Sequence, residues 1–291
     1  MYENSPSKDL ILLAGKDDTN TFSGKNVSFL LEVGGERVIT NVLRAIENSI
    51  VERVVIVGPV KILEQFIRKK TKQYHLVECQ SQVSRNILAG INNMSQLSNC
   101  ERVVVLASDL PFLSQTSINW LAHLNRPMYS VIPIVTKDHF TRFSPYYSTY
   151  FWPNSPEPFK WGDAASIPVG EVGNNVSNFI DKYRGSWSQN EFVTIVHRIN
   201  LLLSTTGSGA LPILLCNYLS KLIQQLSSKP FVPLSGLFQI SDYEKALSAM
   251  SGMHIAIAKA PNSELSLDLD NEWRHAFYNK RFQEIRQVLE E

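Results

Sequence analysis

The sequence predicts an α/β protein built around a mainly parallel sheet. Over the first half of the chain, short apolar runs alternate with segments whose apolar residues recur at helical spacing. One run, residues 103–107, is apolar at every position, which is typical of a strand covered on both faces. Such an alternation indicates right-handed βαβ units.

The first strand is expected at residues 10–14 because the apolar run there ends at Gly15, and a polar stretch follows it. The apolar run at residues 53–57 stops at Gly58-Pro59, which closes a second strand. A shorter run at residues 75–79 is the third. Between them, amphipathic spacing predicts helices at residues 38–47 and 61–70.

A further helix is expected at residues 83–94, before the fully apolar strand. That strand should stop near Asp109, because Pro111 cannot donate a hydrogen bond to a sheet. Ser114 can cap a helix that runs through Leu124, and residues 131–135 form the next expected strand.

After residue 135 the pattern changes. Residues 137–161 are rich in aromatics and prolines and indicate an irregular excursion with short strands, either the core of a small insertion or the wall of an acceptor pocket. Helices are expected at 190–203, 211–226 and 272–290, and strands at 255–258 and 265–270. Charges from Arg274 onward should face solvent. We therefore expect one domain, with a core at about 8–135 and 259–291 and an inserted mixed and helical lobe at about 136–258.

The composition limits the classes of binding partner that are indicated for this protein. The formal net charge is +1, and no polybasic run is present, so neither nucleic acid nor a membrane surface is indicated. No apolar stretch reaches membrane-spanning length, and the polar start lacks a signal region, so a cytoplasmic protein is expected.

Acidic side chains occur at two places that suit ligand binding. Asp109 stands at the carboxyl end of its strand, where open α/β sheets bind ligands, although it could instead begin a turn. In an extended 265–270 segment, Asp268 and Asp270 would share one face while the leucines between them face the core. The alternative is an edge strand with acids on its wet side, and with Asp270 or Asn271 capping the last helix. Carboxylates from two segments would suit Mg²⁺.

Glycines after the first strand could let backbone N–H groups approach a phosphate, at Ala14-Gly15 and at Gly34-Gly35. The spacing matches neither a Walker A loop nor a dinucleotide fingerprint.

The order of four segments, LLAG at 12–15, LLEVGGERVI at 30–39, SDLPFL at 108–113 and DLDNE at 268–272, resembles the MobA-like nucleotidyltransferases. The resemblance implies a Rossmann-like GT-A sheet. It also implies Mg²⁺-dependent transfer of a nucleoside monophosphate from a nucleoside triphosphate to a small acceptor, which can itself be phosphorylated, with release of pyrophosphate.

Site residues follow from the same resemblance. Asp109 would be catalytic, and Asp109 with Asp268 or Asp270 would hold the metal. Lys25 is expected as a catalytic phosphate contact that substitutes for the family's lysine, and Lys16 is the alternative. Lys137 or Arg142 would face the acceptor. The nucleotide would be bordered by Leu13, Ala14, Gly15, Gly34, Gly35 and Ser108.

Two alternatives stay open. In a GT-A glycosyltransferase, residues 268–270 would be the D-x-D metal motif, although such a motif usually lies in mid-chain. A noncatalytic relative that binds a nucleotide or a protein is favoured by two departures from the family: Ser28 stands about where the family has a lysine, and Asp17 and Asp18 make the first loop acidic.

Overall fold

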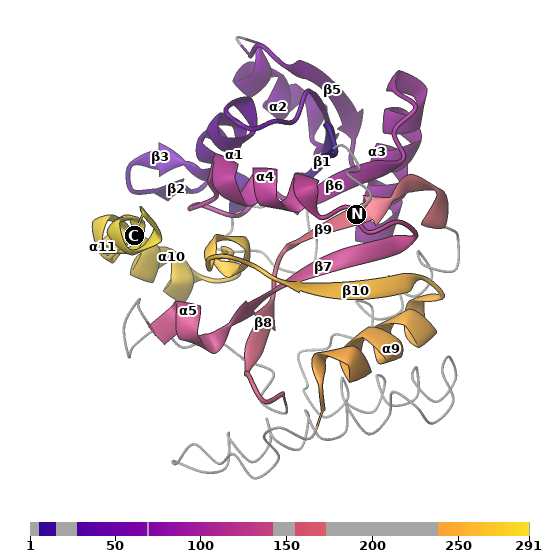
Figure 1. Ribbon diagram of the computed structural model, residues 1–291. Coiled ribbons are helices and arrows are strands. Elements are labelled where there is room, and N and C mark those ends of the chain that lie inside the picture. Colours follow the sequence, from indigo (N-terminus) through magenta and orange to yellow (C-terminus); the bar gives the residue numbers. More distant parts are fainter. Residues whose placement is uncertain (1–5, 16–27, 69, 142–154, 173–237, 291) are drawn as a thin grey trace.

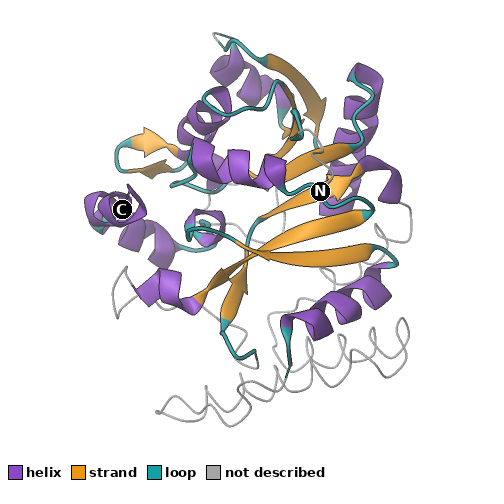
Figure 2. Cartoon of the chain, in the orientation of Figure 1, coloured by secondary structure: helices purple, strands orange, loops and turns teal. Residues whose placement is uncertain are grey.

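The computed structural model describes residues 6–15, 28–68, 70–141, 155–172 and 238–290, and these contain a central sheet with helices on both faces (Figures 1 and 2). The predicted α/β class with a mainly parallel sheet is confirmed. The alternating elements of the first half are β1 (Asp9–Leu13), α1 (Val38–Glu47), β4 (Arg53–Gly58), α2 (Val60–Ile67), β5 (Gln73–Glu78), α3 (Val83–Leu97), β6 (Arg102–Ala107), α4 (Gln115–His123) and β7 (Tyr129–Thr136).

Shorter elements and the C-terminal part complete the described fold. They are η2 (Ser28–Leu30), β2 (Glu32–Val33), β3 (Glu36–Arg37), α5 (Lys137–Thr141), β8 (Phe159–Trp161), β9 (Ala164–Pro168), η3 (Val169–Glu171), α9 (Ile240–Ser251), β10 (His254–Lys259), η4 (Glu264–Ser266), α10 (Glu272–Lys280) and α11 (Phe282–Glu290).

Strand order in the main sheet is β10-β7-β9-β6-β1-β4-β5, and β8 pairs with β7. The neighbours β1, β4, β5 and β6 run parallel. Strand β9 is antiparallel to β6 on one side and to β7 on the other. The sequence therefore comes back into the middle of the sheet after β7, and β9 places the residues before it beside the carboxyl end of β6.

The two faces of β1 belong to two different cores. Leu10 and Leu12 pack on the face covered by α1 and α4, whereas Ile11 packs on the opposite face against α3. All three are fully buried, as expected for a parallel strand with helices on both sides. Burial on both faces explains why the strands read as uninterrupted apolar runs.

Two predicted elements near the C-terminus are wrong. Residues 265–270 are no strand: η4 is followed by irregular chain, whose backbone hydrogen bonds go singly to different segments. Leu265, Leu267 and Leu269 are buried as expected, but Asp268 is buried too, and Asp270 is exposed. The predicted helix at 272–290 is two helices separated at Arg281. This break lets Tyr278 and Phe282 from both helices contact Phe112.

The predicted helices at 190–203 and 211–226 lie outside the described residues. The division into core and inserted lobe stays a prediction, although β8, β9 and β10 are part of the main sheet. In the described parts of the chain, no helix is long and apolar enough to cross a membrane.

Arg102, at the start of β6, links three strands in the centre of the sheet through hydrogen bonds of its side chain. Its buried guanidinium donates to the carbonyl of Ser166 on β9 at 2.8 Å and to the carbonyl of Tyr129 on β7 at 2.7 Å. It also donates to the carbonyl of Arg126. Burial lowers the pKa of Arg102, but these acceptors satisfy its donors.

We predict that Arg102→Ala lowers the free energy of unfolding by about 2 to 4 kcal/mol, because the carbonyls of Ser166, Tyr129 and Arg126 lose the donor that they share. The exposed Arg85 on α3 provides the control, and Arg85→Ala should change stability by less than about 0.5 kcal/mol. Urea unfolding followed by circular dichroism measures both. Equal effects of the two substitutions would show that Arg102 does not fasten the sheet.

Candidate functional site

The site begins where β1 and β6 end side by side. The N–H of Ser108 donates to the carbonyl of Leu13 at 3.1 Å, and the N–H of Ala14 donates to the carbonyl of Val57 at 2.8 Å. Ala14 and Ser108 are buried. The predicted nucleotide-binding residues Leu13, Ala14 and Ser108 thus lie together at the carboxyl edge of the sheet, with Asp109 next to Ser108.

The backbone at Gly15, which follows this edge, packs closely against α3. A Cβ at this position would lie 2.8 Å from Nδ2 of Asn86 on α3. Asn86 is itself fixed, because its Oδ1 accepts the N–H of Gln80 at 2.6 Å and its Nδ2 donates to the carbonyl of Gln80. A glycine is therefore required here by close packing, independently of any nucleotide.

The segment before α10 crosses the same edge and joins it by backbone hydrogen bonds. The N–H of Leu269, between Asp268 and Asp270, donates to the carbonyl of Asp109 at 3.1 Å. The N–H of Asp163 donates to the carbonyl of Leu265 at 2.7 Å, and the carbonyl of Asp163 accepts the N–H of Ala107. The fold thereby gathers Asp109, Asp163, Asp268 and Asp270, which we call the acidic cluster.

Two cations meet this cluster. Nζ of Lys160 on β8 lies 2.5 Å from Oδ1 of Asp268, and Nη1 of Arg274 on α10 lies 2.7 Å from the same oxygen. Nη1 of Arg274 is also 2.7 Å from Oδ2 of Asp270. The expectation that Arg274 faces solvent is therefore wrong, since only 11% of its side chain is exposed. The i,i+4 spacing of Asp270 and Arg274 was the available signal.

Asp163 is a site residue that sequence reasoning missed. Its Oδ2 is buried without a hydrogen-bond partner. Burial raises the pKa of Asp163 well above its usual range, and the nearby charges of Asp268, Asp109 and Asp270 raise it further, while Lys160 opposes them. A single Asp after Gly162 carries no motif, so only its position just before β9 reveals it.

The pKa values of Asp268 and Asp270 move in opposite directions. Burial raises the pKa of Asp268, but Lys160, a hydrogen bond with the side chain of Asp270, and Arg274 more than offset this, so its pKa is lowered. Partial desolvation, the adjacent charge of Asp268 and a hydrogen bond with its side chain raise the pKa of Asp270, although 56% of the Asp270 side chain is exposed. The raised pKa of Asp270 means that a second negative charge beside Asp268 is unfavourable unless a cation compensates it.

The donor set fits Mg²⁺ in the manner of an ion shared with a substrate. Among the described residues, no three carboxylate, imidazole or thiolate side chains converge as a preformed metal cage. Mg²⁺ commonly binds through one or two carboxylates, with phosphate oxygens and water completing its coordination. The acidic cluster offers carboxylate oxygens and the unpartnered Oδ2 of Asp163, which suits such an ion.

Gly34 and Gly35 form the turn between β2 and β3, with φ of 64° and 84°. The N–H of Gly34 donates to Oδ1 of Asn279 on α10 at 3.0 Å. A Cβ on Gly34 would lie 2.5 Å from the ring of Phe282. The contacts of Gly34 hold the hairpin against the C-terminal helices, and the positive φ of both residues favours glycine without a nucleotide.

Lys137, predicted to face the acceptor, begins α5, and its N–H donates to the carbonyl of Pro158 at 2.8 Å. Lys25 and Arg142 lie outside the described residues. Lys137 and Arg142 on the acceptor side, and Lys25 as a phosphate contact, stay predictions.

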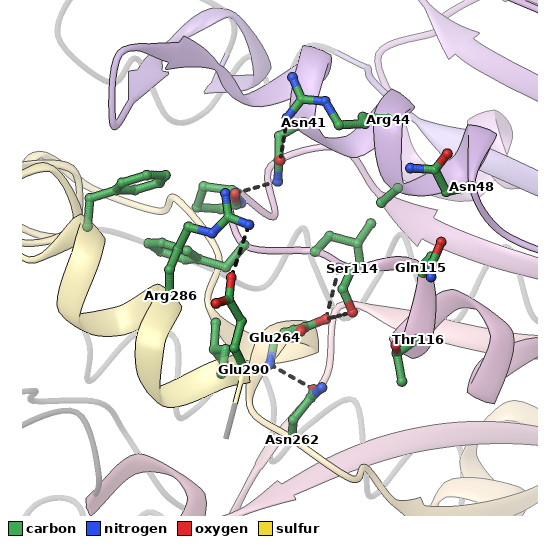
Figure 3. Close-up of a pocket in the computed structure, with 16 residues that line it drawn as sticks. Asn41, Arg44, Asn48, Ser114, Gln115, Thr116, Asn262, Glu264, Arg286 and Glu290 are labelled. Carbon is green, nitrogen blue, oxygen red and sulfur yellow. Dashed lines mark hydrogen bonds and ion pairs between the residues drawn. The ribbon is translucent and has the colours of Figure 1, made fainter.

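A separate pocket of about 410 Å³ opens between α1, the start of α4, η4 and α11 (Figure 3). Oε2 of Glu264 accepts hydrogen bonds there from N–H and Oγ of Ser114 and from Oγ of Ser117. Across the pocket, Arg286 pairs with Glu290. None of the predicted site residues lines this pocket, so the acidic cluster is an independent feature.

Residues 27–168 match the model of the MobA-like NTP transferase domain, which confirms the resemblance predicted from the sequence. A search of curated proteins finds no significant match. Among solved structures, a hypothetical transferase from Thermus thermophilus is 18% identical, with a TM-score of 0.59, over 94% of this chain and 100% of that one. It shares the fold.

Two further structures resemble the chain more distantly. A 4-diphosphocytidyl-2C-methyl-D-erythritol synthase from Anaerococcus prevotii is 12% identical, with a TM-score of 0.49, over 95% of this chain and 97% of that one. A nucleotidyl transferase from Methanothermobacter is 11% identical, with a TM-score of 0.47, over 99% of each chain.

We predict that Asp163→Asn stabilises the metal-free protein at pH 8 by about 1 to 3 kcal/mol, because it removes a carboxyl group whose ionised form the folded protein compensates only in part. The raised pKa of Asp163 means that the folded state keeps a proton which the unfolded chain has released. The contribution of Asp163 to unfolding free energy therefore falls as pH rises above about 4.

The difference between Asp163→Asn and wild type should accordingly shrink as pH is lowered toward 4. Urea unfolding at several pH values in the presence of a chelator measures it, and Glu101→Gln on the exposed surface is the control. A difference that does not change with pH would contradict the raised pKa.

Proposed function

Because residues 27–168 belong to the MobA-like NTP transferase family, we propose that this protein is a Mg²⁺-dependent nucleotidyltransferase. It transfers a nucleoside monophosphate from a nucleoside triphosphate to a small acceptor, with release of pyrophosphate. One observation carries the assignment: the hydrogen bond from Leu269 to Asp109 joins two acidic segments that are far apart in the sequence.

The nucleotide binds along the carboxyl edge of β1 and β6 in this proposal. Lys25 contacts its phosphates, and the residues that border it are Leu13, Ala14, Gly15, Gly34, Gly35 and Ser108. The backbone at the end of β1 is the support for this placement, because Leu13 and Ala14 are fixed to both neighbouring strands. Binding at the carboxyl ends of the strands agrees with the general rule for open α/β sheets.

Asp109, Asp270 and Asp268 are the proposed ligands of the cation. When bound, Mg²⁺ would neutralise charge on the triphosphate and act as a Lewis acid at the α-phosphate. The carboxylate of Asp268 is less free to rearrange around a metal ion than that of Asp270, because Lys160 and Arg274 already contact Oδ1 of Asp268. The side chain of Asp270 is 56% exposed.

The acceptor approaches from the side of Lys137 and Arg142 in this proposal. An oxygen of the acceptor forms a bond to the α-phosphorus while the bond to the bridging oxygen of pyrophosphate breaks in line with it. Negative charge increases on the leaving pyrophosphate. The role of the protein's residues is to position both reactants and to compensate this charge.

The test is release of pyrophosphate from each nucleoside triphosphate with a panel of phosphorylated and alcohol acceptors and Mg²⁺. We predict that Asp109→Asn lowers the rate by about 10²-fold or more, because a charge that acts on the reacting phosphates is lost. The exposed Glu64 on α2 offers a matched control, and Glu64→Gln should leave the rate unchanged.

Thermal unfolding separates this proposal from its alternatives. We predict that a nucleoside triphosphate raises the melting temperature only with Mg²⁺, and that Asp109→Asn abolishes the shift, because ligands that bind the folded state stabilise it. A metal-dependent shift with nucleotide-sugars alone would favour a glycosyltransferase. Nucleotide binding without turnover would favour a noncatalytic nucleotide-binding relative. No response to any nucleotide would contradict both enzymes and leave a relative that binds a protein.

A further inference from the structure

One guanidinium nitrogen lies among the oxygens of the predicted metal ligands. Nη1 of Arg274 is 2.7 Å from Oδ1 of Asp268 and 2.7 Å from Oδ2 of Asp270. It is also 3.4 Å from the main-chain carbonyl oxygen of Asp268. A nitrogen placed between two carboxylates and a carbonyl takes the position that a hard cation would take among the same oxygens.

The fold holds Arg274 in this position. Asn271 caps α10 by accepting the N–H of Arg274 at 2.9 Å, which sets Arg274 in the first turn of the helix. Its side chain is 11% exposed, whereas that of Asp270 is 56% exposed. Arg274 therefore contacts the pair from the protein side, and Asp270 leaves the other side open to solvent.

Lys160 and Arg274 differ in what they contact. Lys160 lies 2.5 Å from Oδ1 of Asp268 and 2.6 Å from the carbonyl oxygen of Ser266, so it is a direct counter-ion of Asp268 that does not depend on Arg274. Arg274 bridges Asp268 and Asp270. If Arg274 moved away, Asp268 would keep a counter-ion, and the oxygens of both carboxylates would become available together.

We propose that Arg274 is a built-in competitor of the divalent cation. It binds Asp268 and Asp270 when no metal is present, and it has to leave them before a metal binds both. The proposal rests on the proposed function, because it takes these two carboxylates as metal ligands. Mg²⁺ binds oxygen at 2.0–2.1 Å, so it cannot share the same lone pairs with a guanidinium, and the two cations repel each other.

The consequence is a metal affinity below that of the free carboxylates. An opposite charge at contact distance changes the proton affinity of a carboxylate by tenfold or more, and we expect a similar effect on a competing metal ion. Removal of the guanidinium should therefore strengthen metal binding, although it destabilises the metal-free protein.

The test measures binding of Mn²⁺ to the full chain by the loss of the electron paramagnetic resonance signal of free Mn²⁺. We predict that Arg274→Gln binds Mn²⁺ about tenfold more tightly than wild type, whereas Arg274→Lys stays near the wild-type affinity. Arg281 is the matched control, because it pairs with Glu284 at the other end of α10, and Arg281→Gln should not change the affinity.

The outcomes separate the two proposals. If wild type binds Mn²⁺ and Arg274→Gln binds it equally or more weakly, the competitor role is overturned and the metal site stands. If neither protein binds Mn²⁺, with or without a nucleoside triphosphate, the metal part of the proposed function fails and the competitor role fails with it.

A second measurement needs no stable variant at position 274. Nitrogen-15 resonances of arginine side chains report the environment of each guanidinium in wild type. Mg²⁺ should shift the Arg274 resonance and leave that of Arg281 in place. An unchanged Arg274 resonance at saturating Mg²⁺ would overturn the proposal.

Discussion

Charge compensation at the carboxyl edge of the sheet is the constraint on which the site depends. Buried carboxylates are costly unless cations or hydrogen bonds compensate them. Here Lys160 and Arg274 lower the pKa of Asp268, whereas the pKa values of Asp163 and Asp270 are raised. The compensation is thus incomplete. An acidic site that is only partly neutralised by its own protein is suited to an additional cation that arrives with a substrate.

Strand β6 has a charged residue with a structural role at one end and a charged residue of the candidate site beyond the other end. At its start, the buried guanidinium of Arg102 is satisfied by main-chain carbonyls of β9 and β7, and no carboxylate is needed. Just beyond its other end stands Asp109, in a group of like charges. The residue at one end of β6 is therefore a cation whose side chain donates hydrogen bonds to other strands of the sheet. The residue beyond the other end, about 20 Å away by the rise of a strand, is an acid whose surroundings favour a ligand.

The antiparallel strand β9 connects these two ends. Its insertion between β6 and β7 brings Ser166 to Arg102, and it places Asp163 beside Ala107 at the acidic edge. The chain before α10 then closes the site through Leu265 and Leu269, whose backbone groups bond to Asp163 and Asp109. Sheet order, rather than any local motif, decides which acids meet.

Local patterns determined much of the fold: the apolar period of α1, the cap at Ser114 and the apolar run that ends before Asp109 were all readable, because each depends on neighbours in sequence. The acids at 109 and 268–270 could be named as well. The sequence could not place Asp163, nor show that Arg274 lies between two carboxylates. Those contacts depend on strand order and on an irregular segment, and only the tertiary structure fixes distances between residues that are remote along the chain.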